Sequence, residues 1–197
     1  KTRNDLNKIK AIHTVHVEAA NVLRTQFQKD FPQLTISYGD TPSCSMLSDF
    51  SAFDEIRPGN FTFYDLSQYH IGSCTLEDIA VAMLCPVVSR HPDRSEVVVY
   101  GGGVHFSKDR NIDESGMTYF GRVVNWNGDT WHIPKDYSYV RSLSQEHGVI
   151  KASPELMKQT QVGDLLAILP IHSCMTVDLM SHYLTTDGKK IEIWDKI

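Results

Sequence analysis

The sequence predicts two regions of different fold class, an α/β region up to about residue 50 and a mainly antiparallel β region after it. Near the N-terminus, apolar residues recur at spacings of three and four, which is typical of one face of a helix. After residue 50, short β-branched and aromatic runs alternate with turn sequences, which is typical of an antiparallel sheet or a small barrel. We therefore expect residues 1–50 to be the C-terminal end of an α/β domain and residues 51–197 to form a β domain.

The first element is predicted to be a long helix from Asn4 to about Asp30, which Pro32 should end. The run LTISYGD follows as a short strand that ends at Gly39. A helix joined by a brief turn to a strand is half of a βα repeat, and such repeats build parallel sheets or barrels. Because one half cannot stand alone, we expect this region to be part of a larger α/β domain whose earlier part is absent from this chain. The apolar face of the predicted helix is formed by Leu6, Ile9, Ile12, Val15, Ala19, Val22, Leu23 and Phe27.

The β region contains seven runs that we expect to contain strands. Turn sequences such as RPGN, HPDRS, NWNGD and TTDGKK separate them. Only SPELMKQ and MTVDLMSHY are typical of helical turns in this region. The seven predicted runs are NFTFYDL, IAVAMLCPVVSR, SEVVVYGGGVHF, MTYFGRVVNW, YVRSLSQEHGVIKA, DLLAILPIHSC and KKIEIWDKI.

Composition excludes several classes of partner. The 197 residues are 41% hydrophobic and 22% charged, which is enough apolar material for a sizeable core. A net charge of −5 leaves no basic surplus to neutralise phosphates, so we expect no nucleic-acid partner. No stretch has the roughly 20 apolar residues that a membrane span requires, and the start KTRNDLNKIK is not typical of a secretion signal. The four cysteines form no CxxC motif, so we expect a cytoplasmic protein with free thiols, unless one of them binds a metal.

The segment PIHSC is a candidate metal site because a histidine and a cysteine stand two residues apart after the apolar run LLAIL. On an extended segment His172 and Cys174 would point to the same side, and imidazole and thiolate both suit Zn²⁺. Two protein ligands would leave positions for water or substrate, as a catalytic metal requires. The alternative is a buried structural cysteine beside a hydrogen-bonded loop histidine.

The segment SYGDTPS is a candidate anion site. A strand that ends at Gly39 lets the backbone N–H groups of Asp40 and Thr41 approach an anion, with the Thr41 hydroxyl as a further donor. The alternative is an ordinary turn from strand to loop. We assign no function to the remaining histidines outside the motifs below, including His13 and His16, which lie about one turn apart on the first helix.

Five separated motifs, in this order, resemble the C-terminal part of the D-serine dehydratase and D-threonine aldolase family. They are ISYGDTPSCS, RPGNFTFYDL, CPVVSRHPDRSEVVVYGGGVHFSKD, SLSQEHGVI and VGDLLAILPIHSCMTVDLM, and the resemblance extends from about residue 33 to residue 190. It implies a pyridoxal-phosphate enzyme of the alanine-racemase fold type, with an α/β barrel followed by a β domain. It also implies a homodimer in which the β domain of one subunit closes the active site of the other.

The resemblance places the metal ligands at His172 and Cys174. The aldolase branch usually has an aspartate at the second position, so the cysteine favours the dehydratase branch and, because sulfur is a soft ligand, Zn²⁺ over Mn²⁺ or Mg²⁺. It further implies that Glu146 and His147 lie near the metal and the substrate, where either could orient a ligand or move a proton. His105 is a weaker candidate of the same kind, because the glycines before it indicate tight backbone packing first.

The resemblance implies that the cofactor phosphate binds at Gly39, Asp40 and Thr41, with Asn60 and Tyr64 completing the pocket. The Schiff-base lysine of such enzymes lies on the first barrel strand, and no motif in this chain matches it. We therefore expect the C-terminal part of a lyase for a small D-3-hydroxy amino acid, which would convert D-serine to pyruvate and ammonia and be inactive without its upstream half. Alternatives are an aldolase that cleaves the Cα–Cβ bond, a racemase-like isomerase, and a β-rich binding module without chemistry of its own.

Overall fold

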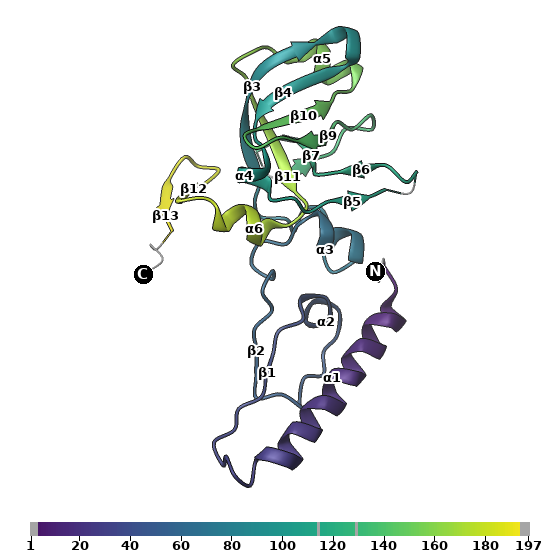
Figure 1. Cartoon of the computed structure of the whole chain (residues 1–197), viewed down its shortest axis with the longest axis vertical. Helices are drawn as coiled ribbons and strands as arrows, with labels where there is room; N and C mark the ends of the chain where they lie inside the picture. Colours follow the sequence, from purple (N-terminus) through teal and green to yellow (C-terminus); the bar gives the residue numbers. More distant parts are fainter. Residues whose placement is uncertain (1–3, 114, 129, 194–197) are drawn as a thin grey trace.

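The computed structural model describes residues 4–113, 115–128 and 130–193. Figure 1 shows a long helix with a few short elements beside it at one end, and a β barrel at the other. Within the described residues, no helix is both long and apolar enough to cross a membrane.

The N-terminal region is an α/β arrangement, as the sequence predicts. Helix α1 (Leu6–Phe27) begins at Asp5, whose side chain accepts from the backbone N–H of Lys8 at 3.2 Å, and it ends well before Pro32. Strand β1 (Ser37–Tyr38) pairs in parallel with β2 (Glu55–Ile56), and helix α2 (Thr41–Met46) lies between them in the chain. Parallel pairing of two strands separated by a helix is the arrangement expected at the end of a βα barrel.

The apolar face of α1 is largely uncovered in this chain. Of all the residues of α1 only Ile9 and Ala20 are buried, and of these only Ile9 belongs to the predicted apolar face, whereas Val15 is 60% exposed and Val22 is 51% exposed. The inward contacts of α1 include two histidines, His13 and His16, whose rings both contact the Tyr38 hydroxyl. These histidines therefore pack α1 against β1.

The β region is built around a closed barrel of six strands in the order β11-β3-β4-β10-β9-β7, with β11 also paired to β7. Every one of these pairings is antiparallel. Closure explains why the predicted runs alternate between buried and exposed positions, because one face of each strand lines the interior. The barrel strands are β3 (Met83–His91), β4 (Glu96–Tyr100), β7 (Gly121–Trp126), β9 (Tyr139–Leu143), β10 (His147–Lys151) and β11 (Leu165–Pro170).

Two apolar clusters stabilise this barrel. One fills its interior and includes Cys85, Val97, Phe106 and Ile168. The other includes Leu66, Tyr119 and Ile171 and packs helix α3 (Leu66–Ile71) against the barrel. Cys85 is therefore a core residue, and burial raises the pKa of its thiol to about 12.

Short elements connect and cover the strands. A 3-10 turn η1 (Pro92–Arg94) and helix α5 (Pro154–Gln159) fall where HPDRS and SPELMKQ predict them. Helix α4 (Gly103–Phe106) occupies the end of the predicted run SEVVVYGGGVHF. The others are β5 (Asn111–Ile112), β6 (Thr118–Tyr119), β8 (Trp131–His132), α6 (Ser173–Asp178), β12 (His182–Leu184) and β13 (Lys190–Glu192).

Besides SEVVVYGGGVHF, which ends in α4, two other predicted runs differ from the structure. The run NFTFYDL contains no strand. Asp65 is the N-cap of α3 and accepts from the backbone N–H of Gln68, while the Asn60 side chain bonds to the side chains of Asp65 and Ser173. The run DLLAILPIHSC is a strand only to Pro170, after which the chain bends into α6. The last predicted run, KKIEIWDKI, forms β13, and its residues 194–197 lie outside the described part of the chain.

Candidate functional site

The candidate metal ligands lie at the start of α6, immediately after barrel strand β11. His172 is the N-cap residue of this helix and Cys174 lies in its first turn. The expectation that both residues occupy an extended segment is therefore wrong, since the helix begins between them. Both lie at the N-terminal end of α6, His172 with extended backbone and Cys174 with helical backbone.

The His172 ring is oriented by a carboxylate. Its Nδ1 lies 2.5 Å from Oδ2 of Asp109, which belongs to the loop after α4. A carboxylate can only accept, so Nδ1 carries the hydrogen, and Nε2 of the neutral ring is left with its lone pair. Metal-binding histidines typically show this pairing of one ring nitrogen with a carboxylate.

The Cys174 thiol is half-buried beside a cleft. Its Sγ lies 3.5 Å from the backbone oxygen of Gly59. Burial raises the pKa of this thiol, and the negative charge of Asp65 raises it further. A bound cation would be needed to favour the thiolate here.

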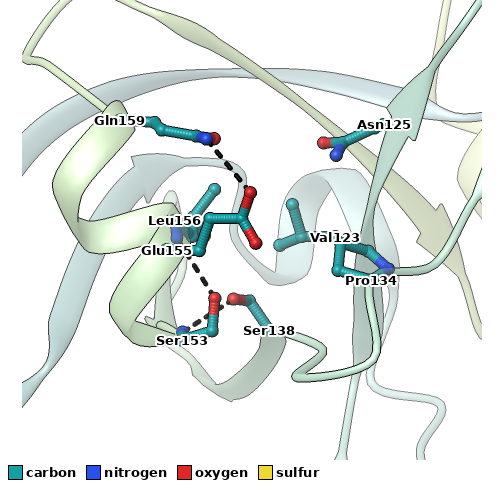
Figure 2. Close-up of a pocket in the computed structure, with 8 residues that line it drawn as sticks. All are labelled: Val123, Asn125, Pro134, Ser138, Ser153, Glu155, Leu156 and Gln159. Atoms are coloured by element: carbon teal, nitrogen blue, oxygen red, sulfur yellow. Dashed lines mark hydrogen bonds between the residues drawn. The ribbon is translucent and has the colours of Figure 1, made fainter.

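The cleft next to Cys174 is the size of a small-ligand site. It has a volume of about 500 Å³ and lies between the segment around Phe63 and the residues that follow α6. Its walls include Gly59, Thr62, Phe63, Val177 and Met180. By contrast, the hollow beneath α5 in Figure 2 has a volume of about 20 Å³, which is room for one water and not for a substrate.

The donor set of this site fits an open metal centre and does not fit a closed one. An imidazole and a thiol are present, and the described residues include no group of three or more His, Cys, Asp or Glu side chains that could hold a metal ion. A structural Zn²⁺ takes four protein ligands, whereas a catalytic one leaves positions open. We therefore treat His172 and Cys174 as a two-residue metal pair with room for other ligands.

A buried polar network fixes the helix that carries the metal pair. Ser173 donates from its backbone N–H to Asp65 at 3.0 Å and from its hydroxyl to Oδ1 of Asn60 at 2.7 Å. The Asn60 side-chain amide in turn donates to Asp65. All three residues are buried. The side chain of Asn60, expected to complete a phosphate pocket, therefore holds the start of α6.

The predicted phosphate loop, residues 39–41, is joined to the same network. The backbone N–H of Asn60 donates to the Thr41 hydroxyl at 3.1 Å. A Cβ at Gly39 would lie 3.1 Å from the backbone oxygen of Arg57, so this position favours glycine. Asp40 is the N-cap residue of α2, and its carboxylate accepts a hydrogen bond from the backbone N–H of Ser43 at 3.3 Å.

The start of α2 leaves few backbone donors for a phosphate group. Pro42 has no N–H and the N–H of Ser43 already donates to the Asp40 carboxylate, so phosphate binding here would depend on the backbone N–H groups of Asp40 and Thr41, and it stays a prediction. Tyr64, the other residue expected in this pocket, contacts Ser45 of α2 through its hydroxyl at 3.0 Å. The structure thus brings Tyr64 to α2, and its role in cofactor binding stays a prediction.

Glu146 and His147 lie where the segment 101–103 is clamped against the segment 144–148. Backbone N–H groups of Gly101 and Gly103 donate across this contact at 2.9 Å each, to Glu146 and Ser144 respectively. The prediction that the glycines serve tight packing is confirmed. The roles of Glu146 and His147 near metal and substrate stay predictions.

His105 lies on α4, which packs against α6. Its Nδ1 accepts from the backbone N–H of Gly102 at 3.1 Å. Burial lowers the pKa of His105, while the charge of Glu146 raises it. His105 thus has a structural partner, and the weaker functional prediction for it remains untested.

Sequence reasoning missed Asp109 and Asp65. Asp109 stands in SKDRNIDES, which is typical of an exposed loop, and it is separated from His172 by 63 positions. The one available signal was that SKD belongs to the same motif as GGGVHF. Asp65 resembled the end of a strand and gave no signal of its contact with Ser173.

Comparison with known proteins shows that the sequence of this chain is similar to dehydratases. Residues 80–186 match the family described as "Putative serine dehydratase domain". The D-serine dehydratase of Dictyostelium discoideum is 36% identical over 159 residues, which is 76% of this chain and 38% of the relative. The D-threo-3-hydroxyaspartate dehydratase of a Delftia strain is 28% identical over 189 residues, which is 92% of this chain and 48% of the relative. The chain therefore spans about half the length of these relatives or less.

Solved structures agree on the fold. An Ala racemase-like protein from Idiomarina loihiensis has a TM-score of 0.72 and 27% identity, covering 87% of this chain and 46% of that one. A histidine-to-alanine variant of D-threo-3-hydroxyaspartate dehydratase has a TM-score of 0.72 and 27% identity, covering 89% of this chain and 46% of that one. A cysteine-to-alanine variant of the same enzyme has a TM-score of 0.71 and 26% identity, covering 89% of this chain and 47% of that one. The cysteine variant is described as metal-free, and its substituted position lies two residues after that of the histidine variant. The expected C-terminal β domain of the alanine-racemase fold type is confirmed.

Proposed function

The chain belongs to the serine dehydratase domain family, and from this premise we propose that it is the C-terminal part of a pyridoxal-phosphate-dependent lyase that acts on a D-3-hydroxy amino acid. The proposed reaction is dehydration with loss of ammonia, which gives pyruvate when the substrate is D-serine. The observation that carries the proposal is the metal pair, His172 and Cys174, at one end of α6 beside a cleft of substrate size. The metal-free cysteine variant of a relative, with the same histidine-to-cysteine spacing, supports it.

The residues of this chain would divide the work of binding. Residues 39–41 would hold the cofactor phosphate through backbone N–H groups, and the metal pair would hold Zn²⁺. When bound, pyridoxal phosphate stabilises negative charge at the substrate α-carbon and Zn²⁺ polarises the 3-hydroxyl. The network of Asn60, Asp65 and Ser173 would keep these two sites at a fixed separation, because it contacts both the phosphate loop and α6.

The proposal extends to the assembly. The lysine that bonds to the cofactor would come from the barrel half of the full-length protein, and the active form would be a homodimer. A D-threonine aldolase from Filomicrobium marinum shares the fold at 19% identity, which supports the fold alone. Since cysteine is a softer ligand than the aldolase aspartate, the metal pair favours the dehydratase.

Cys174→Ala in the full-length protein tests this proposal. Removing one of two protein ligands should lower zinc content and D-serine turnover together, while the absorbance of bound cofactor stays, because the phosphate loop is separate. Cys174→Asp keeps an anionic ligand but makes it hard, so the bound metal should shift toward Mn²⁺ or Mg²⁺. Metal analysis by mass spectrometry and a turnover assay measure both effects.

A purely structural cysteine would behave differently in this pair of variants. Cys174→Ala would then cost about 1 kcal/mol of stability, and zinc content would not change. Unchanged zinc together with retained turnover in Cys174→Ala would contradict the metal site and the proposed reaction.

A further inference from the structure

The contact between Asp109 and His172 is not explained by stability. The two side chains are 51% and 39% exposed, and at such a surface even a fully charged pair contributes only about 0 to 1 kcal/mol. The partners come from different parts of the barrel surface, the loop after α4 and the start of α6. A contact that adds little stability but fixes the orientation of one ring points to a role at that ring.

The backbone before Asp109 is constrained in a way that places its carboxylate. Segment 101–103 is clamped to segment 144–148, and Phe106 at the end of α4 is only 1% exposed. Ser107 then has φ 62° and ψ −168°, a conformation that residues other than glycine rarely adopt. The Ser107 hydroxyl accepts from the backbone N–H of Asp109 at 3.2 Å. Strain of this kind persists where the surrounding structure determines it, and here it directs the loop toward His172.

We infer that Asp109 is a positioning residue for the metal, which it serves by fixing the tautomer and ring orientation of His172. Because Nδ1–H is donated to Asp109, Nε2 is the ring nitrogen that can bind a cation. The carboxylate also makes the imidazole a better donor to the metal. This inference rests on the proposed metal pair and adds to it a residue that touches neither substrate nor metal.

The test measures zinc affinity in the full-length protein. The protein is stripped of metal with a chelator and titrated with Zn²⁺ in competition with a chromogenic chelator. Asp109→Ala should weaken zinc binding by about 10-fold to 100-fold, as loss of a carboxylate partner does at other histidine ligands. Asp109→Asn should weaken it less, because the amide oxygen can still accept from Nδ1. A matched control is Asp93→Asn, which removes an exposed carboxylate from η1 and should leave zinc affinity unchanged.

The outcomes separate this inference from the proposed function. The midpoint of thermal unfolding of the metal-free variants should match wild type, because both partners are partly exposed; if Asp109→Ala fails to fold, Asp109→Asn decides. Wild-type zinc affinity in Asp109→Ala, with zinc lost in His172→Ala, would overturn the inference and leave the metal site standing. Wild-type affinity in His172→Ala would overturn the metal site and this inference together.

Discussion

Asp65 is a fully buried carboxylate that is held by hydrogen bonds. Its two oxygens accept from the backbone N–H of Gln68, the backbone N–H of Ser173 and the side-chain amide of Asn60. Within the described ranges, no lysine or arginine forms an ion pair with it. A buried carboxylate tolerates the loss of water when its oxygens are satisfied in this way, so the geometry around Asp65 depends on every one of these donors.

Asp65→Asn should destabilise the protein although it preserves the shape of the side chain. The new NH₂ group is a donor and would face an N–H group, which is also a donor, where the carboxylate oxygen had accepted a hydrogen bond. A buried polar group left unsatisfied in this way costs about 1–3 kcal/mol. The measurement is the thermal midpoint of the full-length protein. Asp78→Asn, at an exposed carboxylate that accepts from the backbone N–H of Thr75, is the control and should have a smaller effect. Equal thermal midpoints for wild type and Asp65→Asn would contradict the expectation that the network of Asn60, Asp65 and Ser173 depends on a carboxylate at position 65.

The individual site residues differ in how far sequence could reveal them. His172 and Cys174 lie two positions apart, so their pairing is local and could be predicted from PIHSC. Asp109 and Asp65 act through partners 63 and 108 positions away. Only tertiary structure brings such partners together, and a single sequence contains no periodicity that reports it.

At the scale of elements, the close contact between segment 101–103 and segment 144–148 requires glycine at position 102 more strictly than at position 103. A Cβ at Gly102 would lie 2.5 Å from backbone atoms of Gln145, Glu146 and His147, whereas a Cβ at Gly103 would meet only the Ser144 oxygen at 3.5 Å. Backbone atoms cannot move aside as a side chain can. The two glycines therefore provide a matched pair of substitutions.

Gly102→Ala should lower stability by about 1–3 kcal/mol, because the clamp must open to admit the methyl group. Gly103→Ala should be close to neutral, since 3.5 Å is an ordinary contact. Thermal unfolding of the two variants in the full-length protein measures the difference. If the clamp holds Asp109 in place, Gly102→Ala should also weaken zinc binding, whereas similar midpoints for both variants would contradict the tight backbone contact.

The elements that sequence predicted well are those whose signals are local. SPELMKQ begins with a Ser–Pro helix start, and α5 follows with Ser153 as its N-cap. NFTFYDL fails for the opposite reason, because its aromatic residues suggest a strand while Asn60 and Asp65 bond elsewhere. β-propensity reports a fit to a half-buried sheet, and these polar contacts override it.

At the scale of the whole molecule, the two regions of the chain differ, since one is a closed barrel and the other has a two-stranded sheet beside a long helix. The six-stranded barrel closes on itself, whereas the parallel pair of β1 and β2 is the only sheet beside α1 in the described residues. Much of the apolar face of α1 is exposed, with Val15 at 60% and Val22 at 51%. The closed barrel and the mostly exposed face of α1 agree with a chain that spans about half of its relatives.

Residues 1–197 alone should form no stoichiometric covalent bond with pyridoxal phosphate. The family resemblance puts the bonding lysine on the first barrel strand, and no motif here matches it. Borohydride reduction after incubation with the cofactor, followed by peptide mass spectrometry, measures the labelling. The full-length protein under identical treatment is the control and should carry the label upstream of Lys1. One fully labelled lysine within residues 1–197 would refute the expectation.

Strand β11 pairs on both sides, since Ala167 faces Leu84 of β3 and Val124 of β7, and Ile168 faces Met83 and Val123. A strand held by two neighbours can shift its alignment only if both ladders break at once. A shift of one residue would move the following segment by about 3.3 Å and turn each side chain to the opposite face of the barrel wall. Because His172 and Cys174 follow this strand directly, an alignment error that displaced them would also disrupt the packing of the barrel core.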